Sequence, residues 1–110
     1  MSQAKAVLRN LHALSERRYV GDTNASDVLL DFHYAVKRAR LTDRQSEALR
    51  LVYVEDLTQR SAGERMGIDF TNVSHAIREA TESIDEIYEY IAWHNGELIA
   101  DEFTEAEAIG

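Results

Sequence analysis

The chain has 110 residues, of which 45% are hydrophobic, so it is long enough to fold as one domain around a packed core. It contains no Cys, which excludes disulfides, thiolate metal sites and a cysteine nucleophile, and no Pro that would interrupt a helix. No apolar run approaches the length that spans a bilayer, and no charged-then-apolar leader is evident. We therefore expect a cytoplasmic protein that does not associate with membranes.

Charge is divided unevenly along the chain, whose net charge is −8. Residues 1–78 contain all 12 Lys and Arg against ten Asp and Glu, which gives +2. Residues 79–110 contain ten acidic residues and no Lys or Arg, which gives −10. Because the acids are segregated at one end, the net charge does not exclude nucleic-acid binding by the rest of the chain.

Two helices are predicted before residue 41. The first runs from Gln3 to about Tyr19, and the Gly-, Asp- and Asn-containing segment Val20–Ser26 is expected to be a loop. Ser26 is the expected N-cap of the second helix, which runs to about Arg40. The apolar residues at helical spacing are Val7, Leu8, Leu11 and Leu14 in the first helix, and Val28, Leu29, Phe32, Val36 and Ala39 in the second.

The densest basic cluster spans the junction between the second and third predicted helices. It consists of Lys37, Arg38, Arg40 and Arg44. Solvation and phosphate contact are equally open interpretations there, whereas a solvated face is favoured for the basic residues of the first helix. His33 is expected to be a partly buried packing residue, because no other His or Cys lies at metal-ligand spacing from it.

A third helix is predicted to begin after Thr42. Gln45 follows three residues later, which is the spacing of a capping box. Leu49, Val52 and Tyr53 form the expected apolar side of this helix, and the next residues connect it to the following motif.

Leu57–Arg78 has the pattern of two helices joined by a tight turn. Thr58 is a suitable N-cap for the first helix, and Gly63 permits another helix to approach its backbone closely. Gly67 suits the left-handed residue that ends this helix, and Asp69 is the expected N-cap of the next one. The inward residues of the second helix are Val73, Ala76 and Ile77. This order is typical of a helix-turn-helix, whose second helix enters a DNA major groove.

From Leu41 to Ile84 the sequence resembles region 4 of sigma-70-type transcription factors and the sigma-like activators encoded by bacteriophages. The matching pieces are LTDRQSEALRLVYVEDLTQ, AGERMGI and NVSHAIREA, in that order. The resemblance implies a trihelical core in which the third predicted helix supports the helix-turn-helix. It also implies duplex DNA as ligand and RNA polymerase as a partner at promoters.

The resemblance also implies which residues contact DNA. The base-facing residues are expected to be Phe70, Thr71, Asn72, Ser74, His75 and Arg78, and the phosphate contacts Thr58, Gln59, Arg60 and Arg44. Ordinary exposed helix surface is the alternative for Asn72 and Ser74. Members of the family commonly carry Arg or another long polar residue where this chain has Phe70 and Ser74. The resemblance therefore implies the family's docking mode for this chain but not its promoter specificity.

The recognition helix is predicted to continue from Phe70 to about His94, where Asn95 and Gly96 provide a C-cap. Its apolar residues alternate in spacings of three and four, and they are Phe70, Val73, Ile77, Ala80, Ile84, Ile87 and Ile91. We favour packing of this stripe against the N-terminal helices. The alternative is a homodimer through the Ile77, Ile84, Ile87 and Ile91 stripe or through exchanged N-terminal helices. A parallel pair would bring like charges together at Glu79, Glu82, Asp85, Glu86 and Glu89.

Together these patterns predict an all-α fold of about five helices. Residues 1–96 form a single helical domain, with an N-terminal helical pair at 1–40 and the helix-turn-helix with its extended helix at 41–96, and residues 97–110 form an acidic tail. The expected function is a sequence-specific transcription regulator of the phage late-gene type, acting with RNA polymerase in the host cytoplasm. The alternatives are a DNA-packaging adaptor resembling a phage small terminase subunit and an RNA polymerase-binding interaction module. We expect no enzyme, cofactor or metal, because no nucleophile–base pair, ligand cluster or Gly-rich phosphate loop is evident.

Overall fold

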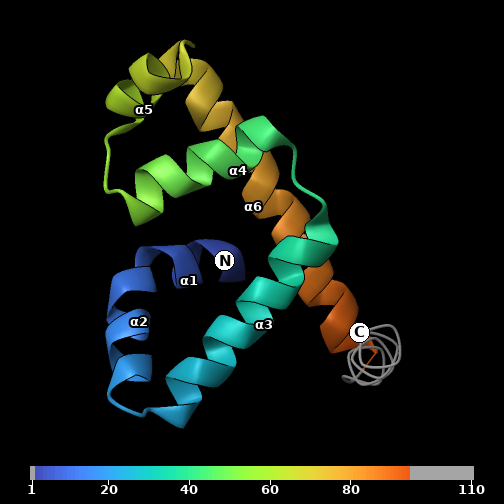
Figure 1. Cartoon of the computed structure of the whole chain (residues 1–110). Coiled ribbons are helices and arrows are strands. Elements are labelled where there is room, and N and C mark those ends of the chain that lie inside the picture. The colour runs from blue at the N-terminus through green and yellow to red at the C-terminus, as the bar shows by residue number, and fades with distance from the viewer. Residues whose placement is uncertain (1, 95–110) are drawn as a thin grey trace, which may run out of the picture.

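The computed structural model describes residues 2–94, which are helical apart from short connections (Figure 1). The elements are α1 (Gln3–Arg9), α2 (Leu11–Tyr19), α3 (Thr23–Ala39), α4 (Asp43–Leu49), the π-helix η1 (Arg50–Val54), α5 (Gln59–Met66) and α6 (Phe70–Trp93). No strand occurs in this part of the chain, which confirms the all-α prediction. Among residues 2–94, no helix has both the length and the apolar composition that crossing a membrane requires.

The long helix α6 is shared by two groups of helices. Its first half packs with α4 and α5, and its second half runs beside α3, with α1 also in contact (Figure 1). The buried residues of α6 are Val73, Ala76, Ile77, Ala80, Thr81, Ile84 and Tyr88. The predicted stripe is therefore covered within the chain over most of its length, in agreement with the favoured interpretation. Its first residue, Phe70, is an exception because 48% of its surface is exposed.

The prediction of a single first helix is wrong, because the helix is divided into α1 and α2 at Asn10. The backbone of Asn10 leaves helical geometry with φ −107° and ψ 14°, and its side-chain amide donates to the Ala6 carbonyl at 2.8 Å. Asn side chains compete in this way with the backbone for hydrogen-bonding partners. The break lets α1 contact α6 while α2 packs along α3 (Figure 1).

Helix α3 begins earlier than predicted, and Asp22 rather than Ser26 is its N-cap. The Asp22 carboxylate accepts hydrogen bonds from the backbone N–H groups of Asn24 at 3.0 Å and Ala25 at 3.2 Å. Because these bonds satisfy the first turn, Ser26 lies inside the helix and the predicted loop shrinks to three residues. His33 in this helix is exposed, so its predicted packing role is also wrong.

An acidic residue of α6 caps the N-terminus of α1. The Asp85 carboxylate accepts a hydrogen bond from the Ala4 backbone N–H at 2.8 Å and another from the Ser2 hydroxyl at 2.6 Å. The Ser2 Oγ in turn accepts from the Lys5 backbone N–H at 3.1 Å. A negative charge at a helix N-terminus is stabilising because it faces unpaired N–H groups and the positive end of the helix dipole. Asp85 is thus a structural link between α1 and α6.

The contact between α3 and α6 contains the groups with clearly shifted pKa values. Burial, followed by the charges of Asp31 and Asp85, raises the pKa of Tyr88 to about 12. Burial and then the charge of Asp27 raise the pKa of Asp31. Both shifts favour the neutral forms at this helix contact.

Helix α4 begins as predicted but continues as a π-helix. Thr42 and Gln45 form both bonds of the capping box. From Arg50 the chain widens into η1, in which Glu55 donates its N–H to the Arg50 carbonyl at 3.0 Å. A π-turn adds one residue and rotates the side chains that follow. Within this segment Leu51 is fully buried, whereas Val52 and Tyr53, predicted for the apolar side, are partly buried against the core.

Candidate nucleic-acid interface

The connection between α5 and α6 is the tight turn expected from the sequence. The Thr58 hydroxyl accepts from the Ser61 N–H at 3.1 Å, which caps α5. Gly67 has φ 71° and ψ 30°, the left-handed conformation that Gly adopts without steric cost. The N–H of Gly67 bonds to the Glu64 carbonyl and that of Ile68 to the Gly63 carbonyl, a Schellman arrangement. These local bonds fix the direction in which α6 leaves.

Gly63 is needed for the same turn. A Cβ atom at this position would lie 2.7 Å from the Ile68 carbonyl oxygen and 3.3 Å from the Phe70 nitrogen. The close approach predicted for Gly63 therefore exists, and it is made by the turn together with the first residue of the next helix, α6. This contact fixes the distance between the end of α5 and the first residue of α6.

Asp69 occupies the N-cap position of α6 in an extended conformation, as predicted, but its side chain makes no capping hydrogen bond. Its carbonyl oxygen accepts from the N–H groups of Asn72 at 2.9 Å and Val73 at 3.2 Å. The side-chain cap expected at this position is therefore wrong, and the exposed carboxylate leaves the first turn of α6 accessible.

The predicted base-facing residues form one exposed surface, which we call the reading face. Its members are Phe70, Thr71, Asn72, Ser74, His75 and Arg78, and all six are exposed. The residues between them, Val73, Ala76 and Ile77, are buried against the other helices. Helical periodicity thus separates the two sets as the sequence suggested.

Arg60 and Phe70 connect the two helices of the motif across this surface. The guanidinium carbon of Arg60 lies over the Phe70 ring, 5.6 Å from the ring centroid. That distance is within the range of a cation–π interaction. The pairing was missed in the sequence because the two residues lie on different helices, and only the turn geometry brings them together.

Of the other predicted phosphate contacts, Thr58 and Gln59 are exposed at the start of α5, and Arg44 is exposed in the first turn of α4. The neighbour of Arg44, Gln45, donates its side-chain amide to the Glu79 carboxylate of α6 at 3.2 Å. Since Glu79 directly follows Arg78, the first turn of α4 lies beside the end of the reading face.

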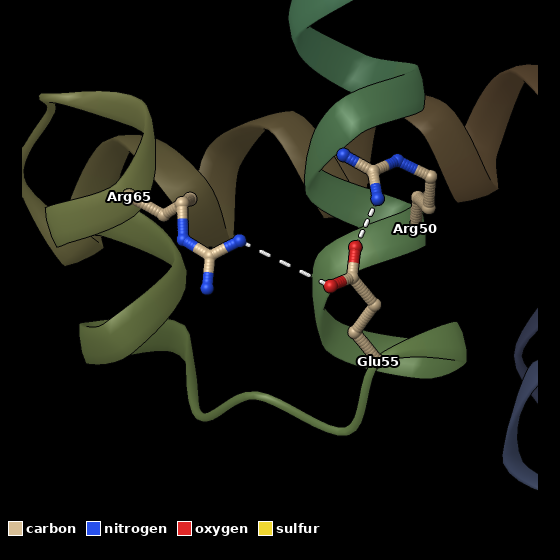
Figure 2. Close-up of polar contacts among 3 residues, drawn as sticks. All are labelled: Arg50, Glu55 and Arg65. Atoms are coloured by element: carbon tan, nitrogen blue, oxygen red, sulfur yellow. Dashed lines mark hydrogen bonds and ion pairs between the residues drawn. The ribbon is translucent and has the colours of Figure 1, made fainter.

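Two further cations near the motif share one acid (Figure 2). The Glu55 carboxylate forms an ion pair with Arg50 and also faces Arg65, with 4.0 Å between its Oε1 and the Arg65 Nη1. These contacts tie η1 to α5 across the connector. Because one carboxylate offsets part of both charges, Arg50 and Arg65 add less positive potential than their number suggests.

The same connector is linked to the N-terminal helices. The His12 Nε2 of α2 lies 3.0 Å from the Asp56 Oδ1, and Asp56 has a positive φ of 58°. Short polar residues such as Asp tolerate this conformation better than most. Within residues 2–94, no group of three or more His, Asp or Glu is arranged to hold a metal ion.

The fold and the exposed face on its second motif helix define a helix-turn-helix of the DNA-binding kind. Residues 39–84 match the family described as Sigma-70, region 4. This part of the chain, from the end of α3 to the middle of α6, is a sigma-70 region 4-like helix-turn-helix. Searches of curated proteins and of solved structures gave no match. The helices α1 and α2, all of α3 except its last residue, and the last nine residues of α6 lie outside the matched span.

Proposed function

We propose that the chain is a sequence-specific transcription regulator that binds promoter DNA together with RNA polymerase. The observation that supports this function best is the reading face, which presents six exposed side chains on the recognition helix of a sigma-70 region 4-like motif. In this proposal the chain acts by binding and carries no enzymatic activity. The sequence resemblance favours the late-gene regulators of bacteriophages as its type.

The chemistry of the reading face suits a major groove. Asn72 can bond bidentately to adenine, His75 can bond to a purine edge, and the Thr71 methyl group can contact thymine. The first turn of α5, beginning after Thr58, directs backbone N–H groups and the Arg60 side chain to the phosphates beside that groove. Sequence is then read by the start of α6, and position is set by α5 together with Arg44 and Arg78.

The small number of cations near the reading face predicts weak binding by one copy. Strong, salt-sensitive binding usually involves about six to ten phosphate contacts. Arg44, Arg60 and Arg78 are the cations proposed for this role, and Arg50 and Arg65 share Glu55. RNA polymerase holding the same promoter, or a second copy of the chain, would supply the missing affinity.

The second candidate is an interaction module that binds RNA polymerase through its acidic side. It is favoured by one observation, namely that Glu82, Glu86 and Glu89 are all exposed on the second half of α6. This function predicts that neutralising these acids abolishes partner binding and that changes on the reading face do not.

Fluorescence anisotropy with a duplex selected from a random library tests the two functions. We expect specific binding by wild type that strengthens when RNA polymerase is present. Arg78→Ala should weaken binding, and Arg17→Ala should leave it unchanged, because Arg17 is an exposed cation on α2, away from the motif. If selection recovers no preferred duplex, or if wild type binds no DNA at about 50 mM salt with or without polymerase, the proposed function is lost.

A further inference from the structure

We propose that Phe70 and Arg60 form one composite contact that recognises the C5-methyl group of a thymine in the major groove. The inference rests on the proposed function, because it names a feature of the DNA that the reading face would select. It assigns the apolar part of the recognition to Phe70 and the positioning of its ring to Arg60.

The position of Phe70 is the first reason. It is the first residue of α6, and the N-terminal residues of a recognition helix are those that meet base edges. Its side chain is 48% exposed, whereas Val73, the next residue of the apolar stripe, is fully buried. Phe70 therefore contributes less to the core than its place in the stripe suggests, and it presents an aromatic surface beside polar side chains.

The chemistry of the groove is the second reason. Among the four bases, thymine alone presents a methyl group in the major groove, and Phe is one of the side chains that contact it. The polar members of the reading face, such as Asn72 and His75, instead match donors and acceptors on base edges. A thymine methyl group is thus the groove feature that complements Phe70.

The placement of Arg60 is the third reason. Its guanidinium lies over the Phe70 ring with 5.6 Å between its central carbon and the ring centroid. A planar guanidinium stacked on a ring keeps its N–H donors around its rim, where they remain able to bond to a phosphate. Arg60 can therefore hold the ring in place and neutralise the backbone beside the same thymine.

The turn fixes the two backbone segments that carry this pair. Gly63 allows the backbone of Phe70 to approach α5 so closely that a Cβ atom would lie 3.3 Å from the Phe70 nitrogen. Thr58 caps the turn of α5 that carries Arg60. Because both backbones are fixed, DNA binding needs to order only the two side chains, which lowers the entropic cost of a sequence-specific contact.

Replacing thymines with deoxyuridine tests the inference, because this change removes one methyl group and keeps base pairing. Each thymine of the duplex selected with wild type is replaced in turn, and affinity is measured by anisotropy. We expect a position at which deoxyuridine weakens binding by about fourfold, the effect of losing one buried methyl group. At this position the loss should be unchanged in Thr71→Ser, which removes the other methyl group proposed to contact thymine. In Phe70→Ala this difference between the two duplexes should disappear.

A matched control separates the effect of Arg60 on the thymine preference from the effect of its charge on overall binding. Arg60→Gln should reduce the thymine-over-deoxyuridine preference and also weaken binding overall. Arg44→Gln removes an exposed cation elsewhere and should weaken both duplexes equally, so that the preference is kept. Phe70→Leu retains an apolar side chain without a ring, so it should keep part of the thymine-over-deoxyuridine preference. In this variant the preference should no longer change when Arg60→Gln is added.

The outcomes separate this inference from the proposed function. If wild type binds its selected duplex but no deoxyuridine position weakens it, or if Phe70→Ala retains the preference, the methyl contact is wrong and the proposed function stands. If Arg60→Gln leaves the preference unchanged, the composite contact is wrong. If wild type selects no duplex, both proposals fail. Circular dichroism of each variant establishes that lost preference does not come from unfolding.

Discussion

Replacing Ile84 with Ala tests whether the N-terminal helices hold the second half of α6. The Ile84 side chain is fully buried. It lies one residue before Asp85, whose carboxylate bonds to the start of α1 at 2.8 Å. Ile84 therefore lies in the core where α6 meets the N-terminal group of helices.

The expected magnitude follows from the size of the change. Truncating a buried Ile to Ala removes apolar contacts and leaves a cavity, at a cost of about 2–5 kcal/mol in unfolding free energy. A domain of this size has a total stability of about 5–15 kcal/mol. At about 4–8 °C per kcal/mol, the melting temperature should fall by at least about 8 °C.

Thermal melts followed by circular dichroism, with solution mass measured at several concentrations, check this expectation. Ile91→Ala is the matched control, since it makes the same change in the same helix at a partly buried position and should cost clearly less. An unchanged melting temperature for Ile84→Ala would refute the packing described here. A wild-type dimer that Ile84→Ala converts to monomers would instead place this residue in a seam between copies.

Four further outcomes are expected. Gly67→Val should unfold the motif or abolish DNA binding, because a β-branched residue is strongly disfavoured at φ 71°, and circular dichroism with anisotropy reports both. Asp85→Ala should lower the urea midpoint by the equivalent of about 1–2 kcal/mol, because the start of α1 loses its cap. Burial and two nearby carboxylates raise the pKa of Tyr88 to about 12, while an unfolded tyrosine titrates near pH 10. The folded state therefore binds the phenolic proton more tightly than the unfolded state does. The stability that this difference contributes is lost as the pH rises from about 10 to 12. Tyr88→Phe has no such proton, so it should lose less stability over that range in urea melts. Asn72→Ala should cost about 1–3 kcal/mol at the selected duplex only, whereas Arg78→Ala should weaken all duplexes and lower the salt slope by about one, as measured by anisotropy across a salt series.

The helix-turn-helix was predictable because short-range chemistry determines it. Thr58 lies next to the helix that it caps, and Gly67 is the kind of residue that a left-handed helix end requires. The separation of the reading face from Val73, Ala76 and Ile77 follows from helical periodicity alone. The domain boundaries and the DNA contacts of individual residues stay predictions, and the acidic tail and the C-cap at residues 95 and 96 lie outside the described residues.

The features that the sequence did not reveal depend on contacts between distant segments. The bond from Asp85 to Ala4 joins residues 81 apart, so nothing local distinguishes Asp85 from the acids around it. The π-helix η1 was also missed, because the residues before it follow a regular helical pattern. The break at Asn10 is a local event that was missed because Asn also occurs within regular helices.

The geometry of α6 explains how a chain with a net charge of −8 can present a DNA-binding face. At 1.5 Å per residue, Glu86 lies about 21 Å along the helix from Asn72, and Glu82 lies about 10 Å from His75. The Debye length at physiological salt is about 8 Å, so Glu86 would be screened from phosphates at the reading face, whereas Glu82, which lies about 6 Å along the helix from Arg78, would be screened only from phosphates near His75. Of the acids that follow the reading face along α6, Glu79 is the closest, and its carboxylate accepts a hydrogen bond from Gln45, which directs it toward α4. One continuous helix therefore carries the proposed DNA-binding face near its start and its acidic residues further along, and this separation requires α6 to stay intact between the two.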